Sequence, residues 1–130
     1  MTGKSILIVE DEDNIALALH HLLGREGYRL SRVADGALAL DAVRDQRPDL
    51  VLLDVMLPNV SGYEICQALR ADADLADLRI LIMTARGTEI ERRKGLAMGA
   101  DGFITKPFEL TQLRQEVARL LTDGGTADEA

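Results

Sequence analysis

Short apolar runs alternate along the chain with longer segments whose apolar residues recur at helical spacing. Three runs, at residues 6–9, 50–53 and 80–83, contain no polar residue. Such runs are typical of strands that are covered on both faces, as in a parallel sheet. Residues 28–33 alternate between polar and apolar, which indicates an edge strand with one wetter face, and residues 103–104 predict a short fifth strand.

Helical periodicity follows each of these strands. The apolar positions are, in chain order, Ile15, Leu19, Leu22 and Leu23; Leu38, Ala42 and Val43; Ile65, Ala68 and Leu69; Ile90, Leu96 and Ala97; and Leu110, Leu113, Val117, Leu120 and Leu121. Asp13 is expected to cap the first helix, and Ser61 with Glu64 predicts a capping box before the third. The fourth segment, residues 88–98, has the weakest apolar stripe.

A strand followed by a helix, repeated along the whole chain, predicts an α/β fold with a parallel sheet and helices on both faces. We expect five strands in the flavodoxin-like order 2-1-3-4-5. The predicted domain spans residues 4–121. Residues 122–130 are small and polar, and we expect them to form a flexible tail.

Composition and net charge limit the classes of protein to which this chain can belong. The 130 residues suffice for one domain, and 47% hydrophobic with 28% charged residues is typical of a globular protein. A formal net charge of -7 argues against direct nucleic-acid binding. The single cysteine, Cys66, excludes an internal disulfide, and no apolar run has the length of a membrane span or a secretory signal. We therefore expect a cytoplasmic protein without a membrane partner.

Chemically versatile residues follow four of the predicted strands. Glu10 and Asp11 come after the first strand, Asp54 after the third, Thr84 after the fourth and Lys106 after the fifth. Because the carboxyl ends of parallel strands meet at one edge of the sheet, we expect these side chains to converge there.

Three carboxylates at one place would repel each other unless a cation joined them, and Mg²⁺ with oxygen ligands suits such a group. Asp54 stands alone at its strand end, so we assign it as the nucleophile that accepts phosphorus. The metal site would comprise Glu10, Asp11 and Asp54, with the backbone carbonyl of Met56 as a further oxygen. A lysine and a hydroxyl, such as those of Lys106 and Thr84, are what the remaining phosphoryl oxygens need.

Each of these residues also has a structural explanation. Acidic residues at 10–13 favour a helix N-terminus, and Asp54 could form the turn before Pro58. Thr84 could be a helix cap, and Lys106 a solvated surface residue. The coincidence at four strand ends favours the chemical interpretation.

Several short motifs of this chain resemble the receiver domain of two-component response regulators. The matching stretches are residues 6–12, 52–58, 61–62, 83–85, 99–101 and 106–108. The resemblance extends over residues 4–121, and residues 84–108 look most like the winged-helix transcription-factor subfamily.

This resemblance implies a phosphorylation-switched signalling module. Asp54 would take a phosphoryl group from a phosphohistidine on a sensor histidine kinase or a histidine phosphotransfer protein. Asp11 would bind Mg²⁺ directly, and Glu10 mainly through water. Thr84 and Lys106 would hold phosphoryl oxygens.

The resemblance also implies a switch and a set of partners. Thr84 and Phe103 match the switch positions, although Phe103 is equally well explained as core. The output would be contact with a downstream protein, and a homodimer formed on phosphorylation is a further candidate. Gly102 and Glu116 stand where we expect Asp and Arg for the usual dimer. We expect either a stand-alone receiver or a piece of a longer regulator.

Two other functions compete with this interpretation. An aspartyl-nucleophile phosphohydrolase would carry a second Asp two residues after the nucleophile, where this chain has Met56. An interaction module that has lost phosphorylation would not need the acidic residues together with Thr84 and Lys106. We therefore expect a phosphoacceptor that assists its own phosphorylation and dephosphorylation, and not an enzyme with other substrates.

Overall fold

The computed structural model describes residues 3–85 and 87–126 and contains a five-stranded parallel sheet in the order β2-β1-β3-β4-β5. The strands are β1 Ser5–Val9, β2 Arg29–Val33, β3 Leu50–Asp54, β4 Arg79–Thr84 and β5 Gly102–Thr105. The predicted fold class and strand order are confirmed, and β2 lies at an edge as its alternating pattern indicated.

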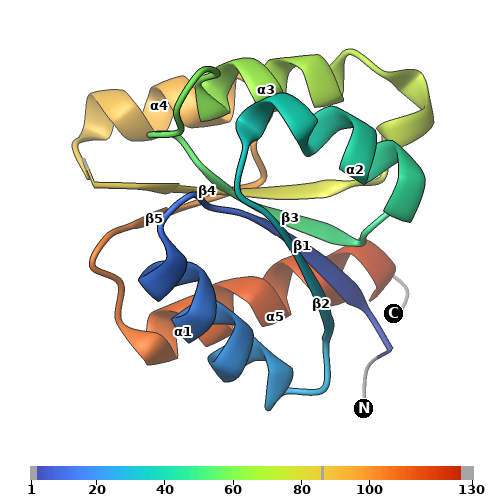
Figure 1. Cartoon of the computed structure of the whole chain (residues 1–130), viewed down its shortest axis with the longest axis vertical. Helices are drawn as coiled ribbons and strands as arrows, with labels where there is room; N and C mark the ends of the chain where they lie inside the picture. The colour runs from blue at the N-terminus through green and yellow to red at the C-terminus, as the bar shows by residue number, and fades with distance from the viewer. Residues whose placement is uncertain (1–2, 86, 127–130) are drawn as a thin grey trace.

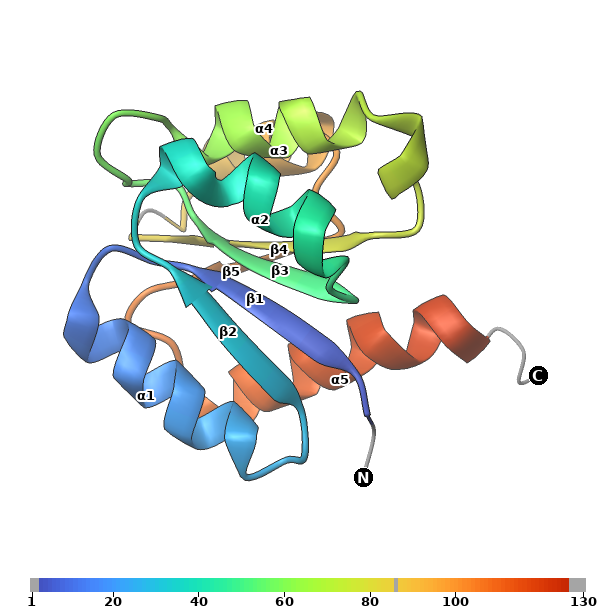
Figure 2. The ribbon, with the colours of Figure 1, turned by 45° about the vertical axis from the view of Figure 1, so that its right-hand side comes forward.

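Helices cover both faces of the sheet (Figures 1 and 2). They are α1 Asp13–Gly24, α2 Ala39–Gln46, α3 Gly62–Arg70, α4 Glu89–Ala97 and α5 Leu110–Thr126, with short 3-10 helices at Gly36–Leu38 and Ala73–Leu75. One face carries α1 and α5, and the other carries α2, α3 and α4. Among the residues described, no helix is both long and apolar enough to cross a bilayer.

The helix α5 extends beyond the domain boundary expected from sequence. It continues to Thr126, whereas the domain was expected to end at residue 121. Residues 127–130 of the expected tail lie outside the described part of the chain. Flexibility of the tail stays a prediction.

The three central strands form the core because both of their faces are apolar. Every residue of β3 is buried, as are the last four residues of β1 and the last five of β4. Their side chains enter two separate hydrophobic clusters, one under each helical layer. At roughly 1.5–3 kcal/mol per buried aliphatic side chain, these strands are the rigid part of the molecule. They therefore provide a fixed support for the side chains that follow their carboxyl ends.

The predicted caps had different outcomes. Ser61 and Glu64 form the expected capping box at the start of α3. The prediction that Asp13 caps α1 is wrong, because Glu12 is the N-cap residue and makes no side-chain capping bond. Asp13 is instead the first helical residue, and its Oδ1 lies 2.9 Å from a guanidinium nitrogen of Arg32. That partner comes from β2, so a local sequence pattern could not reveal it.

The start of α3 lies directly against the end of β3. A Cβ at Gly62 would stand 2.3 Å from the backbone carbonyl oxygen of Asp54, which is closer than non-bonded atoms approach. The Gly62 N–H also donates to the Val55 carbonyl at 3.2 Å. Only glycine fits this approach, and it holds the loop after β3 closely against the strand.

We therefore predict that Gly62→Ala lowers the free energy of unfolding by about 2 kcal/mol, because backbone and not a flexible side chain must move. Denaturant unfolding of the two proteins measures the difference. Gly24→Ala is the control, since its Cβ would meet only a Leu30 methyl at 3.7 Å. The control should leave stability unchanged or raise it by about 1 kcal/mol at most. Equal effects of the two substitutions would contradict the prediction.

Candidate functional site

The carboxylates expected to converge do so at the carboxyl edge of the sheet. Glu10 follows β1 and Asp54 ends β3, and these two strands are neighbours in the sheet. One carboxylate oxygen each from Glu10, Asp11 and Asp54 lies within 4.8 Å of the others. Glu10 and Asp54 are buried, with 0% and 2% exposure, whereas Asp11 is exposed. The cluster thus has two buried members and one that solvent can reach.

Lys106 brings a positive charge to this cluster. Its Nζ lies 2.9 Å from Glu10 Oε1 and 3.3 Å from Asp54 Oδ2. Its backbone N–H donates to the Thr84 carbonyl at 2.6 Å, which anchors the loop after β5 to the end of β4. The following peptide bond, Lys106–Pro107, is cis. The lysine is therefore placed by both its side chain and its main chain.

Burial and charge compete at this site. Burial raises the pKa of the Glu10 carboxyl, although hydrogen bonds from Lys106 and from the Glu12 N–H oppose the rise. Burial by itself would lower the pKa of Lys106, but the hydrogen bond to Glu10 and the charges of Asp54 and Glu10 outweigh it and raise that pKa. The ammonium is therefore held in its charged form between the two carboxylates.

Asp54 is oriented by the backbone that follows it. The Met56 N–H donates to Asp54 Oδ1 at 3.1 Å, while Oδ2 faces Lys106. The Val55 N–H donates to the Met83 carbonyl at 3.1 Å and thereby fixes the turn. Met56 is 70% exposed and therefore lies at the surface, not over Asp54 in the core. Whether the Met56 carbonyl binds a metal stays a prediction.

The two residues expected to form a switch lie in neighbouring strands, Thr84 at the end of β4 and Phe103 near the start of β5, in register with Ile82. Thr84 is the last residue of β4 and is buried, with 2% exposure. Phe103 is half-buried in β5 and lies against α4, where a Cβ at Gly95 would come within 3.3 Å of its ring. The structure thus connects β5 to the helix with the weakest apolar stripe. Their role as a switch stays a prediction.

Two contacts near the site join segments that the sequence pattern does not connect. The Tyr63 hydroxyl donates to Glu91 Oε1 at 2.6 Å and so joins the start of α3 to α4. Arg32 Nε donates to the Glu10 carbonyl at 3.0 Å. Arg32 could have been noticed because it is the second-last residue of the predicted edge strand, close to the edge of the sheet where the acidic residues were expected. Nothing in the local pattern around Tyr63 points to Glu91, which is 28 residues away.

Comparison with known families agrees with this geometry. The model of the response regulator receiver domain matches residues 6–118. The chain belongs to this family. It is a phosphoryl-accepting signalling module, and neither the phosphohydrolase nor the unphosphorylated interaction module is favoured.

The relatives of this receiver domain include a sensory transduction protein and a transcriptional regulatory protein. It is 40% identical over 126 residues to the sensory transduction protein RegX3 of Mycolicibacterium smegmatis, with 97% of this chain and 54% of the relative covered. It is 40% identical over 116 residues to the phosphate regulon transcriptional regulatory protein PhoB of Rhizobium meliloti, with 89% and 51% covered. These names agree with the transcription-factor subfamily expected from residues 84–108. The chain spans about half the length of the curated relatives it matches.

Solved structures show the same receiver fold. The chemotaxis response regulator CheY4 of Vibrio cholerae has a TM-score of 0.87 and 31% identity, with 92% of this chain and 100% of that chain covered. The receiver domain of a sensor histidine kinase from Pseudomonas aeruginosa has a TM-score of 0.83 and 31% identity, with 92% and 98% covered. That second structure is described as having a magnesium ion coordinated in its active site cleft.

The ion pairs of Lys106 predict a pH-dependent contribution to stability. Because its pKa is raised above 10.5 in the fold, this contribution is fully present below pH 10.5 and is lost as pH rises through the folded-state pKa. Lys106→Met should therefore lower the free energy of unfolding by about 2 kcal/mol at pH 7, since it leaves two buried carboxylates without their cation. The difference from wild type should shrink above pH 10.5. Denaturant unfolding at pH 7, 9 and 11 measures it, and a difference that grows with pH would refute the prediction.

Proposed function

We propose that Asp54 is the phosphoryl acceptor of this receiver domain and that Lys106 and Thr84 hold the oxygens of the transferred group. One observation supports this most directly: the carboxylates of Glu10, Asp11 and Asp54 gather within 4.8 Å of one another, and the Lys106 ammonium contacts Glu10 and Asp54. Such a gathering of like charges, two of them buried, lowers the stability of the fold. A binding or transfer role accounts for its presence, whereas a structural role does not.

The donor set of this cluster fits Mg²⁺. Carboxylate oxygens are the ligands that this ion prefers, and the cluster retains negative charge beyond what Lys106 offsets. Asp11 is the solvent-exposed member, so we assign it, with Asp54, as a direct ligand. Both oxygens of Glu10 already face donors, Lys106 and the Glu12 N–H, so Glu10 would act mainly through water. The Met56 carbonyl is the proposed further ligand.

When bound there, Mg²⁺ supplies positive charge that stabilises the oxygens of a transferring phosphoryl group. The residues of the chain carry out the remaining work. An oxygen of Asp54 forms a bond to phosphorus while the bond from phosphorus to the nitrogen of a phosphohistidine breaks, and that nitrogen keeps the electron pair. Met56 N–H holds the other side of the Asp54 carboxylate in place. In this sense the domain assists its own phosphorylation. It would assist its own dephosphorylation when water attacks phosphorus and the bond from phosphorus to the Asp54 oxygen breaks, which releases inorganic phosphate and restores the carboxylate.

The proposed donor is a sensor histidine kinase or a histidine phosphotransfer protein, and the proposed receiver of the signal is a downstream protein. The phosphoryl group carries about −1.5 to −2 charges and replaces the single charge of the Asp54 carboxylate, so the added negative charge near Thr84 would bias the arrangement of Phe103 and α4. Of the residues in α4, Gly95 is buried, whereas Ile90 is 78% exposed. Such thin packing suits an element that moves on phosphorylation. A second copy of this chain, in a homodimer that forms on phosphorylation, is a further proposed partner.

Incubation with Mg²⁺ and acetyl phosphate, followed by intact-mass measurement, tests the acceptor. We expect a single phosphoryl adduct on the wild-type chain and none on Asp54→Asn, because the nucleophile is then an amide. Asp45→Asn, which changes an exposed aspartate on α2, is the control and should keep the adduct.

An adduct of equal yield on Asp54→Asn would assign the acceptor elsewhere. Failure of the wild-type chain to form any adduct with either acetyl phosphate or a phosphorylated histidine phosphotransfer protein would overturn the proposed function. Repeated turnover of phosphate esters would instead support the phosphohydrolase.

Magnesium should stabilise the fold, because binding relieves the repulsion among carboxylates that only the folded state brings together. A concentration of 100 times Kd is expected to add about 2.7 kcal/mol. Thermal unfolding with and without Mg²⁺ measures this as a rise in Tm, and Ca²⁺ at the same ionic strength provides a comparison. Asp11→Asn should reduce the rise. If Asp11→Asn and wild type gain equally, Asp11 is not a ligand.

A further inference from the structure

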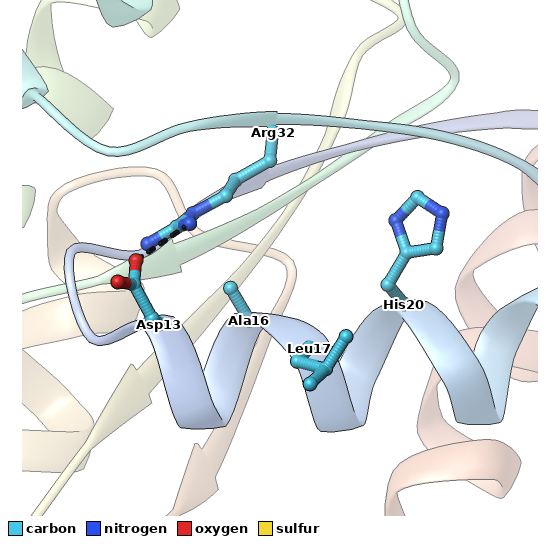
Figure 3. A pocket seen from close by; sticks show the side chains of 5 residues that line it. All are labelled: Asp13, Ala16, Leu17, His20 and Arg32. Atoms are coloured by element: carbon cyan, nitrogen blue, oxygen red, sulfur yellow. Dashed lines mark ion pairs between the residues drawn. The ribbon is translucent and has the colours of Figure 1, made fainter.

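Arg32 connects three elements beside the carboxylate cluster. Its backbone lies in the edge strand β2, in register with Ile8 of β1. Its Nε donates to the Glu10 carbonyl at 3.0 Å, and a terminal nitrogen lies 2.9 Å from Asp13 Oδ1 (Figure 3). One guanidinium therefore holds β2, the loop after β1 and the first turn of α1 together.

The loop that Arg32 holds carries two of the proposed metal ligands. Asp11 lies between Glu10 and Asp13, the two residues that Arg32 contacts. The loop begins with the Glu10 N–H donating to the Val33 carbonyl at 3.1 Å. It ends at the N-cap residue Glu12, which makes no side-chain capping bond. The start of α1 thus lacks its usual local anchor, and Arg32 supplies one from the neighbouring strand.

The two contacts of Arg32 differ in strength. Asp13 has an 89% exposed side chain, and an ion pair with so exposed a partner contributes little by itself. The bond to Glu10 reaches the backbone of a residue with 0% exposure, so water competes with it poorly. The planar guanidinium makes both contacts at once, which the ammonium of a lysine is poorly shaped to do.

A hollow at the surface adjoins Arg32. Asp13, Ala16, Leu17, His20 and Arg32 line it, and Figure 3 shows Arg32 reaching from the strand to the start of the helix along it. The Arg32 side chain is 28% exposed. A shorter side chain at this position would therefore leave solvent and not a cavity in the core, so the fold should tolerate substitution.

We propose that Arg32 is a positioning residue for the cation site: it fixes the loop after β1 so that Glu10 and Asp11 face Asp54. It acts through the loop backbone and through Asp13 and touches neither the metal nor the phosphoryl group. This proposal rests on the proposed function, because it presumes that the cluster binds Mg²⁺.

Charge and position have opposite effects here. Arg32 is a positive charge near a cation site, so its charge alone weakens Mg²⁺ binding by repulsion. If charge were its only influence, Arg32→Gln would bind Mg²⁺ more tightly. If Arg32 positions the ligands, Arg32→Gln binds less tightly, on the order of 10-fold, as expected for the loss of a group that orients metal ligands. The direction of the change therefore decides between the two.

Isothermal titration of the full chain with Mg²⁺ measures Kd for wild type, Arg32→Gln, Arg32→Lys and Arg29→Gln. Arg32→Lys keeps the charge but loses the two-point contact, so its Kd should also rise several-fold. Arg29→Gln removes the same charge from the exposed opposite end of β2 and should change Kd less than 2-fold. Denaturant unfolding without Mg²⁺ checks that every variant is folded.

The outcomes separate this proposal from the proposed function. A wild-type chain that binds no Mg²⁺ overturns both. A wild-type chain that binds, together with Arg32→Gln that binds equally or more tightly, overturns the positioning role alone. Equal weakening by Arg32→Gln and Arg29→Gln would also overturn it, since the effect would then follow the strand and not the contact.

Discussion

Repulsion among carboxylates is the constraint on which the site depends. The ends of β1 and β3 bring Glu10 and Asp54 together in a buried place, and Asp11 adds a third negative charge at its rim. Lys106 offsets part of this repulsion, and its own pKa rises as a result. The negative charge that Lys106 does not offset is the physical basis of the proposed affinity for a divalent cation.

Packing of the core holds the carboxylates in place despite their mutual repulsion. Adjacent parallel strands fix Asp54 opposite Met83 in register, and both faces of β3 are buried under helices. The carboxylate positions therefore follow from the packing of the sheet more than from the loops. Gly62 extends this control to the loop after β3, because its Cα lies against the Asp54 backbone. Asp54 cannot move away from the cluster without disturbing the core.

The central strands and α4 differ in how tightly they are packed. The central strands bury nearly all of their residues, whereas Gly95 supplies the buried position of α4. This helix contacts Phe103 through Gly95 and the start of α3 through the hydrogen bond of Tyr63 with Glu91. Under the proposed function, a change of charge at Asp54 would have its largest effect on the element whose position is least strongly held. The thin apolar stripe of α4 fits that proposed role.

The sequence by itself determined the strands, their order and the edge of the sheet where chemistry belongs. Four-residue apolar runs, and residues such as Glu10, Asp54 and Thr84 directly after them, are local signals of burial and of strand ends. The tertiary structure alone decided the partners: Arg32 with Asp13, Tyr63 with Glu91, and Lys106 with Glu10. Such pairs join distant segments, so their geometry depends on register and on how helices lie across the sheet. A one-dimensional pattern records how deeply a residue is buried, but it does not record which side chain it faces.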